Sequence, residues 1–183
     1  MFKKFLLLAS ACLMAIGPAV AAEKVKIGFV TTITTPAGVI GKDMVDAVNL
    51  AMEDIGGKMA GLDVELIVED DGFKPAIGKQ KTDKLVKQDK VQFVTGFIWS
   101  HVLLASQKSA LGAGKFLISS NAGPSQMAGK LCHKNFFSTS WQNDQTPMAM
   151  GEVLNLNNVK SLYVMAPNYA AGKNMVAGVP RTF

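Results

Sequence analysis

Residues 24–57 read KVKIGFVTTITTPAGVIGKDMVDAVNLAMEDIGG, and this segment determines the fold class that we predict. Residues 24–30 alternate and then become wholly apolar, which is typical of a strand entering a sheet that is covered on both faces. Residues 31–38 are rich in Thr, Pro and Gly, so they predict a loop. From Gly41, apolar residues recur at three- and four-residue steps until a glycine pair, which predicts a helix.

The same strand, loop and helix pattern recurs along the rest of the chain. Strands or extended segments are predicted at 62–68, 91–96, 115–119, 135–140 and 159–165. Helices are predicted from Pro75, over 99–112, from Asn143 or Asp144, and from Ala171. Short strands that alternate with helices of this length predict an α/β fold, with a parallel sheet, right-handed crossovers and helices on both faces.

Composition excludes several classes of protein. Of the 183 residues, 49% are apolar and 18% are charged, which is too apolar for a disordered tail. The only long uncharged run is at the N-terminus, so a membrane protein with several spans is excluded. Without Lys3 and Lys4 the chain has 17 Lys and Arg against 14 Asp and Glu, a net charge of +3. Such a small, scattered charge gives no basic stripe, so we expect no nucleic-acid partner.

Residues 1–22 have the pattern of a secretory signal peptide. Two lysines precede the apolar run 5–16, Pro18 follows it, and small residues end the segment. A lipid-modified Cys12 is the alternative, and the residues before this cysteine match a lipobox poorly. We therefore predict that the mature protein is exported and works in the periplasm.

The mature chain keeps few residues that could bind metal. Cys132 is its only cysteine, so we predict no internal disulfide and no zinc site. His101 and His133 have no carboxylate pattern around them, and we expect ordinary surface or loop histidines. No metal and no cofactor are predicted.

The predicted sheet also indicates where a ligand would bind. Ligands of open α/β sheets lie beyond the carboxyl ends of the strands, which here are followed by the loops 31–38, 70–74, 97–100 and 119–124. The helices after these loops begin with unpaired N–H groups and the positive end of the helix dipole, so a carboxylate can bind without arginine. Ser100 could donate to such an anion or simply cap its helix.

Motifs for catalysis are absent or incomplete. Residues 72–80 resemble a phosphate-binding loop, but they have one residue too many between the glycines, and Gln80 replaces the hydroxyl that binds magnesium. Asp70 and Asp71 could suggest acid–base chemistry, yet adjacent acids on a turn usually form and cap that turn. We predict no catalytic residues and favour binding over catalysis.

The order and spacing of several segments resemble one family. It is the branched-chain amino-acid type of ABC-transporter substrate-binding protein, the Leu/Ile/Val-binding family with a type I periplasmic fold. The matching segments are KIGFV at 26–30, AMEDIGG at 51–57, VELIVEDD at 64–71, TGFIWS at 95–100, ISSNAGP at 118–124, STSWQNDQ at 138–145 and PNYAAGK at 167–173. Together they cover essentially the whole mature chain.

The resemblance implies a two-lobed receptor that closes around a small carboxylate and delivers it to the permease subunits of an ABC importer. It divides the chain into a signal peptide at 1–22, an N-terminal ligand-binding lobe at 23–140, and a hinge with the start of a second lobe at 141–183. Family members have roughly twice this length, with two lobes of ~150 residues each. We therefore expect a truncated product or partial sequence that binds weakly and exposes apolar surface.

The resemblance also implies which residues bind the ligand. Its carboxylate would meet hydroxyl and N–H groups at Ser100, Ser120 and Ala122. Asn121 would help through its side chain or only form the turn. The first loop, from Thr34, and Tyr169 of the second lobe would line the cleft, although Tyr169 could equally pack against its own helix.

One departure from the family concerns the wall of the cleft. Amino-acid-binding members commonly have a disulfide between the loops after strands two and three, and the matching positions here are Phe73 and Trp99. The presence of two aromatic residues in place of the two cysteines implies an aromatic wall of the cleft. Such a wall favours aromatic carboxylates over aliphatic amino acids as ligands. Trp99 offers a face for a ring beside the helix that begins near Ser100, and plain packing between lobes is the alternative role.

A ligand-sensing domain of a receptor or regulator is the alternative function of the protein.

Overall fold

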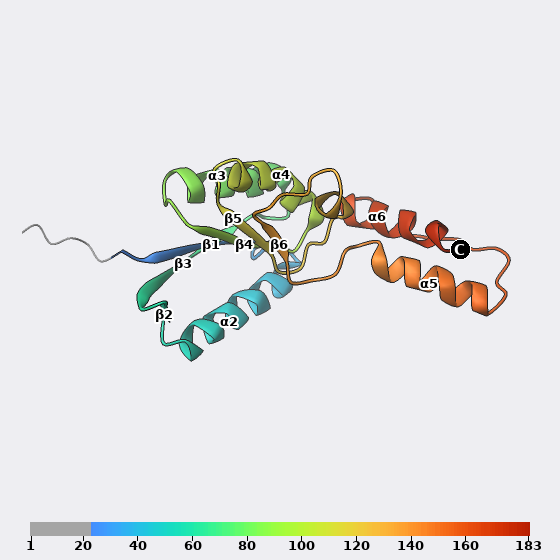
Figure 1. The fold of residues 1–183 in the computed structure, drawn as a ribbon, viewed down its shortest axis with the longest axis horizontal. Helices are drawn as coiled ribbons and strands as arrows, with labels where there is room; N and C mark the ends of the chain where they lie inside the picture. The colour runs from blue at the N-terminus through green and yellow to red at the C-terminus, as the bar shows by residue number, and fades with distance from the viewer. Residues whose placement is uncertain (1–22) are drawn as a thin grey trace, which may run out of the picture.

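The computed structural model describes residues 23–183, so the predicted signal peptide lies outside the described residues. Six strands form one sheet in the order β2-β3-β1-β4-β5-β6 (Figure 1). The strands are β1 Val25–Thr31, β2 Lys58–Met59, β3 Leu62–Asp70, β4 Phe93–Gly96, β5 Phe116–Ser119 and β6 Phe136–Ser138. The predicted α/β class is confirmed.

The long strands of the sheet are parallel to one another. β1 pairs with β3 on one side and with β4 on the other, and β5 and β6 extend the sheet beyond β4. Only β2 is antiparallel, in a tight hairpin with β3 that the sequence analysis did not predict. Because the other five strands run the same way, their carboxyl ends meet at one edge of the sheet.

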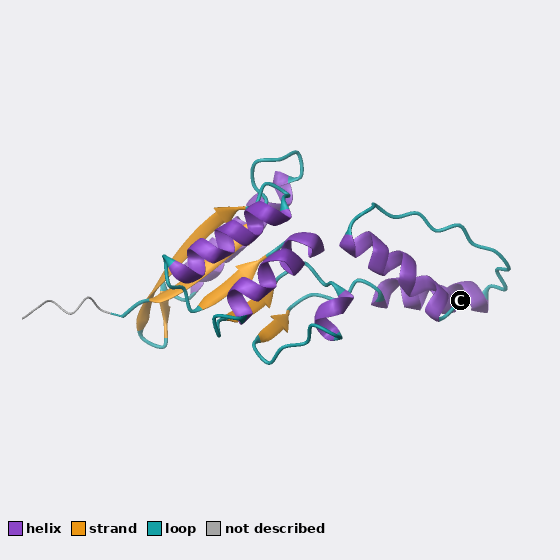
Figure 2. Cartoon of the chain, turned by 90° about the horizontal axis from the view of Figure 1, so that it is seen from above, coloured by secondary structure: helices purple, strands orange, loops and turns teal. Residues whose placement is uncertain are grey.

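Helices cover both faces of the sheet. They are α2 Gly38–Asp54, α3 Pro75–Lys87, α4 Ser100–Leu111, α5 Gln145–Leu156 and α6 Ala170–Gly178, with 3₁₀ turns η2 at Ser125–Ala128 and η3 at Val179–Arg181. α3 and α4 lie on one face and α2 on the other, while α5 and α6 lie side by side beyond the carboxyl edge (Figures 1 and 2). Within residues 23–183, no helix combines the length and the apolar character that crossing a membrane requires.

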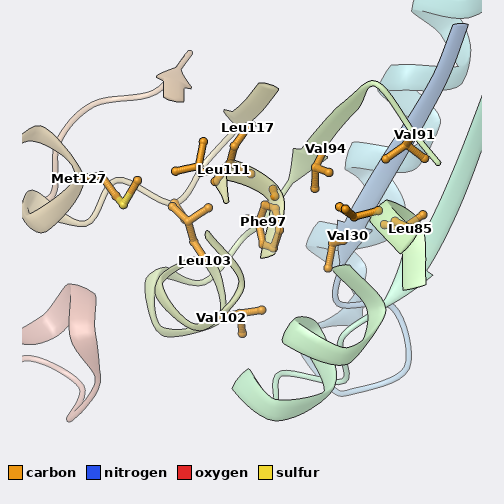
Figure 3. Packing of buried hydrophobic residues seen from close by; sticks show 13 residues of the cluster. Val30, Leu85, Val91, Val94, Phe97, Val102, Leu103, Leu111, Leu117 and Met127 are labelled. Carbon is orange, nitrogen blue, oxygen red and sulfur yellow. The ribbon is translucent and has the colours of Figure 1, made fainter. Parts of the chain in front are cut away.

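The hydrophobic core lies between the sheet and the pair α3 and α4 (Figure 3). Its fully buried members include Val30, Val94 and Leu117 of the sheet, with Leu85, Val102, Leu103 and Phe97 packed against them. α3 and α4 approach closely at Gly78, where a Cβ atom would lie only 2.3 Å from Val102 Cγ1. Close packing on this face holds the loops at the carboxyl edge in place.

One predicted strand is wrong. Residues 159–165 are extended, but they pair with no strand in the part of the chain that the structure describes. A strand is held by hydrogen bonds to a neighbour, and this segment instead joins α5 to α6 as an open loop (Figure 2). Two of its side chains are largely exposed, Tyr163 at 85% and Met165 at 81%.

We expect this exposed segment to drive self-association. An unpaired extended segment with apolar side chains pairs readily with another chain. The double variant Tyr163→Lys, Met165→Lys should therefore shift residues 23–183 from oligomers toward monomer, as size-exclusion chromatography with light scattering would measure. The control Val39→Lys changes a side chain that is 61% exposed on α2, and it should leave the distribution unchanged. Equal effects of both changes would refute the role of the segment.

Candidate functional site

The candidate site lies at the edge of the sheet where β1, β3, β4 and β5 end. From β1 the chain proceeds to β3 on one side, and β4 lies on the other side of β1, so the strand order reverses between β1 and β4. Ligands of open α/β sheets bind at such a switch point. The loops that meet there are 32–37, 71–74, 97–99 and 120–124.

Asp70, the last residue of β3, organises the loop after β1. Its Oδ1 accepts hydrogen bonds from the N–H groups of Ile33 and Gly72, both at 2.9 Å, and its Oδ2 accepts one from Thr34 Oγ1. Partial burial alone would raise the pKa of Asp70, but these hydrogen bonds outweigh it and hold the pKa below its ordinary value. The turn-forming role of Asp70 is confirmed, and the hydroxyl of Thr34 is committed to this carboxylate.

Asp71 is fully buried and fixes the orientation of Trp99. Its Oδ1 accepts hydrogen bonds from Thr32 Oγ1 and, at 2.8 Å, from the N–H of Phe73. The same Thr32 Oγ1 accepts a hydrogen bond of 2.9 Å from the indole Nε1 of Trp99. Asp71 Oδ2 has no partner among the described residues, and burial raises the pKa of this carboxyl above its ordinary value.

The raised pKa of Asp71 gives a prediction about stability and pH. An acid whose pKa is higher in the folded chain loses stability as pH rises from its unfolded value of 3.8 through its folded value. Asp71→Asn keeps one oxygen as an acceptor and cannot ionise. We expect the variant to be more stable than the wild type by about 1 kcal/mol at pH 7, and the difference to shrink at pH 4. Urea unfolding at both pH values measures this, and a variant that is less stable at pH 7 would contradict it.

Four rings from three segments form what we call the aromatic cluster: Phe73, Trp99, His101 and Tyr169. The ring of Phe73 lies edge-on to Trp99, with centroids 4.7 Å apart, and to His101, at 4.8 Å. Tyr169, which precedes α6, closes the cluster at 6.1 Å from Trp99 and 5.4 Å from His101. Burial raises the pKa of the Tyr169 hydroxyl. Edge-to-face geometry at these distances is favourable for aromatic rings.

Ser100 is the first residue of α4, and it lies buried beside the aromatic cluster. The interpretation of Ser100 as a helix cap is wrong, because the cap position is Trp99 and no side-chain hydrogen bond caps this helix. Instead, Ser100 Oγ accepts a hydrogen bond of 2.9 Å from Asn143 Nδ2. Asn143 Nδ2 also lies 3.3 Å from Asn174 Oδ1 on α6. The Ser100 hydroxyl therefore links α4 to the segment that follows β6.

The first turn of α4 has two N–H donors without a hydrogen-bond partner among residues 23–183. The N–H groups of Val102 and Leu103 both donate to the carbonyl oxygen of Trp99, at 3.0 Å. The N–H groups of Ser100 and His101 precede them and have no partner within the helix. These two donors and the positive end of the helix dipole face the loops of the site, which is a suitable arrangement for a carboxylate.

The loop after β5 is fastened to the loop after β4. Three hydrogen bonds join Ser120 N–H to Gly96 O at 3.0 Å, Ala122 N–H to Phe97 O at 2.9 Å, and the Asn121 side-chain amide to Ile98 O at 2.9 Å. The N–H groups of Ser120 and Ala122 are therefore already paired in this structure, although we expected them to meet a ligand carboxylate. Asn121 holds the loop in place, which matches its alternative role in forming the turn.

The hydroxyl of Ser120 lies on the α2 side of the sheet. Its Oγ is 3.3 Å from Thr95 Oγ1, and both residues line a cavity of about 290 Å³ beneath α2. The other lining residues are Phe29, Met44, Ala47 and Val48. Ser100 instead contacts Asn143, so the two serines follow neighbouring strands, β4 and β5, but make separate contacts.

Comparison with protein families identifies the chain at this point. The family model described as a periplasmic binding protein matches residues 24–183, which include every residue of the site. The chain belongs to the periplasmic binding protein family. No curated protein matches it.

Solved structures share the fold of this periplasmic binding protein. An ABC-transporter solute-binding protein from Rhodopseudomonas palustris, in complex with benzoate, is 27% identical with a TM-score of 0.81, covering 88% of this chain and 45% of its own. Another from R. palustris BisB5, in complex with 3,4-dihydroxybenzoic acid, is 26% identical with a TM-score of 0.80, covering 87% and 44%. An isoleucine complex of a branched-chain amino-acid transporter protein from Streptococcus pneumoniae, 22% identical with a TM-score of 0.72 and covering 88% and 47%, shares the fold. The chain thus spans less than half the length of these proteins.

The structure of this periplasmic binding protein brings together only part of the predicted site. Trp99 and Tyr169 meet in the aromatic cluster, and Ser100 lies beside them. Thr34 instead joins the loop after β1 to Asp70 at the end of β3, and Asn121 and Ala122 join the loop after β5 to the loop after β4. No group of three or more potential metal ligands occurs among residues 23–183.

One member of the aromatic cluster, His101, was not predicted to belong to it. Phe73 and Trp99 were expected to form an aromatic wall at the positions that match the family's disulfide, and their rings pack against each other. His101 was expected to be an ordinary surface or loop residue, and this was wrong. Its place two residues after Trp99, in the first turn of the helix, was the signal that could have identified it.

Proposed function

We propose that this periplasmic binding protein is the ligand-capturing part of an ABC importer receptor and that it binds a small carboxylate attached to an aromatic ring. The aromatic cluster beside the first turn of α4 is the observation that carries this proposal. It places ring surfaces next to two free N–H donors and the positive end of a helix dipole. Apolar walls with a few placed polar groups are typical of small-molecule sites.

Each half of such a ligand has a counterpart at the site. The ring would lie against Trp99 and Phe73, whose orientation is fixed by Asp71. The carboxylate would accept hydrogen bonds from the N–H groups of Ser100 and His101. Similar solved proteins bind benzoate and 3,4-dihydroxybenzoic acid, which supports an aromatic acid as the ligand.

The rest of the receptor follows from the same proposal. Residues 23–140 would form the ligand-binding lobe, and residues 141–183 the hinge and the start of a second lobe. The protein would be exported by the signal peptide at 1–22 and deliver its ligand to the permease subunits of the importer without catalysis. The alternative of a ligand-sensing domain is not favoured, because the similar proteins named above are described as transporter binding proteins.

Thermal unfolding of residues 23–183 with and without ligand tests this function. A ligand that binds only the folded state stabilises it by mass action, by about 1.4 kcal/mol at ten times the Kd. For a chain of this size, that corresponds to roughly 3–6 °C in Tm. We expect benzoate to raise Tm and isoleucine to have little effect. A rise with isoleucine alone would overturn the aromatic preference, and no rise with either would overturn the binding role of this chain.

A further inference from the structure

The imidazole of His101 has one nitrogen with a partner and one without. Nε2 lies 3.3 Å from the carbonyl oxygen of Phe73. A carbonyl oxygen only accepts hydrogen bonds, so Nε2 is the donor of this pair. In a neutral imidazole the other nitrogen, Nδ1, is then an acceptor. Nδ1 is buried, and no donor among the described residues reaches it.

The surroundings of His101 explain why Nδ1 stays unpaired. The rings of Phe73 and Tyr169 flank the imidazole with their edges, and the indole N–H of Trp99 already donates to Thr32. A buried acceptor without a donor is unfavourable, and such atoms in folded proteins call for an explanation. A donor supplied by a bound ligand would satisfy it.

Covalent geometry limits where that donor can be on the ligand. The backbone nitrogen and Nδ1 of one histidine are only about 3 to 4.5 Å apart. A carboxylate held by the N–H groups of Ser100 and His101 therefore places its neighbouring carbon near Nδ1. A hydroxyl or ammonium group on that carbon is within reach, whereas a group on the far side of an aromatic ring is not.

We propose that His101 is a specificity-determining residue whose Nδ1 accepts a hydrogen bond from a donor on the carbon next to the ligand carboxylate. This inference rests on the proposed function and narrows its ligand class. The preferred ligands are aryl acids with an α-hydroxyl or α-ammonium group, rather than aryl acids without one. A site built to pair with a ligand donor rejects the analogue that lacks it more strongly than a merely apolar pocket does.

Three ligands with the same skeleton test this inference. Phenylacetate has no α-donor, mandelate has an α-hydroxyl, and phenylglycine has an α-ammonium group. In calorimetric titrations of residues 23–183 at pH 7.5, we expect mandelate, phenylglycine or both to bind at least tenfold more tightly than phenylacetate. Tighter mandelate identifies a hydroxyl as the donor, and tighter phenylglycine identifies an ammonium group.

Variants at position 101 separate recognition from structure. His101→Phe keeps an aromatic ring but removes the acceptor. The affinity for the tighter of mandelate and phenylglycine, divided by the affinity for phenylacetate, should therefore fall to about twofold or less. His101→Asn places an amide oxygen near the position of Nδ1, so it should restore most of the ratio. The control His133→Phe alters the other histidine of the chain and should leave the ratio unchanged.

Two results would overturn the inference alone. One is wild-type protein that is stabilised by benzoate but binds all three skeleton-matched ligands equally. The other is a ratio of affinities, for the α-donor ligand over phenylacetate, that is the same in His101→Phe as in the wild type. If neither benzoate nor any of the three ligands binds, the proposed function falls as well, so the two failures are distinguishable.

Discussion

Gly41→Ala will destabilise the protein by about 3 kcal/mol, at the upper end of the range for overpacking. A Cβ atom at Gly41 would lie only 1.8 Å from the carbonyl oxygen of Thr32 and 2.7 Å from its carbonyl carbon. Both are backbone atoms and cannot rotate away. The first turns of α2 would have to separate from the loop after β1, which also carries the hydrogen bond from Trp99 to Thr32. Urea unfolding monitored by circular dichroism measures the loss.

The matched control for this change is Asn49→Ala on the same helix. Asn49 is exposed, and alanine is the better helix former, so this variant should be as stable as the wild type or slightly more stable. If Gly41→Ala unfolds at the same urea concentration as the control, the close approach of α2 to the loop is not a feature of the molecule.

Trp99→Ala has the second large effect, which is on both stability and binding. Removing this half-buried ring takes away its contacts with Phe73 and Tyr169 and the hydrogen bond to Thr32, at an expected loss of about 2 kcal/mol. Stacking on an aromatic ring contributes about 0.5–1.5 kcal/mol, so the affinity for benzoate should fall by about tenfold. Calorimetric titration below the lowered Tm measures the affinity of the folded variant.

Two further variants separate the ring from its N–H. Trp99→Phe keeps an aromatic face but loses the donor to Thr32, and it should retain affinity within about threefold. Trp141→Ala removes the other tryptophan, which is 59% exposed, and should change stability by no more than about 0.5 kcal/mol. Equal losses of affinity for Trp99→Ala and Trp141→Ala would exclude a specific role for Trp99.

Most of the fold followed from local patterns that depend on few contacts. Alternation over residues 24–30 and the helical spacing from Gly41 correctly predicted β1 and α2, and Pro75 is the first residue of α3. Residues 159–165 have the composition of a strand but lack a neighbouring strand in the described structure. Strand formation depends on such a neighbour, which composition does not reveal. The two-residue strand β2 was too short to give a pattern.

The candidate site was less predictable because hydrogen-bond partners are set by tertiary structure. Asp70 and Asp71 are adjacent in the sequence. Asp70 accepts hydrogen bonds from the loop after β1, at Ile33 and Thr34, whereas Asp71 is fully buried. The N–H of Ala122 pairs with Phe97 because two loops meet, and no spacing in the sequence indicates that pairing. His101 had no metal-like or catalytic pattern around it, and its importance depends on rings contributed by distant segments.

The fluorescence of Trp99 during ligand titration tests the central claim most directly. In a Trp141→Phe background, Trp99 is the only tryptophan of the chain, so its emission reports on the aromatic cluster alone. We predict a saturable change in emission with benzoate, at the same ligand concentrations that raise Tm, and no change with isoleucine. If benzoate raises Tm while the emission of Trp99 stays constant, the ligand binds elsewhere and the assignment of this site is contradicted.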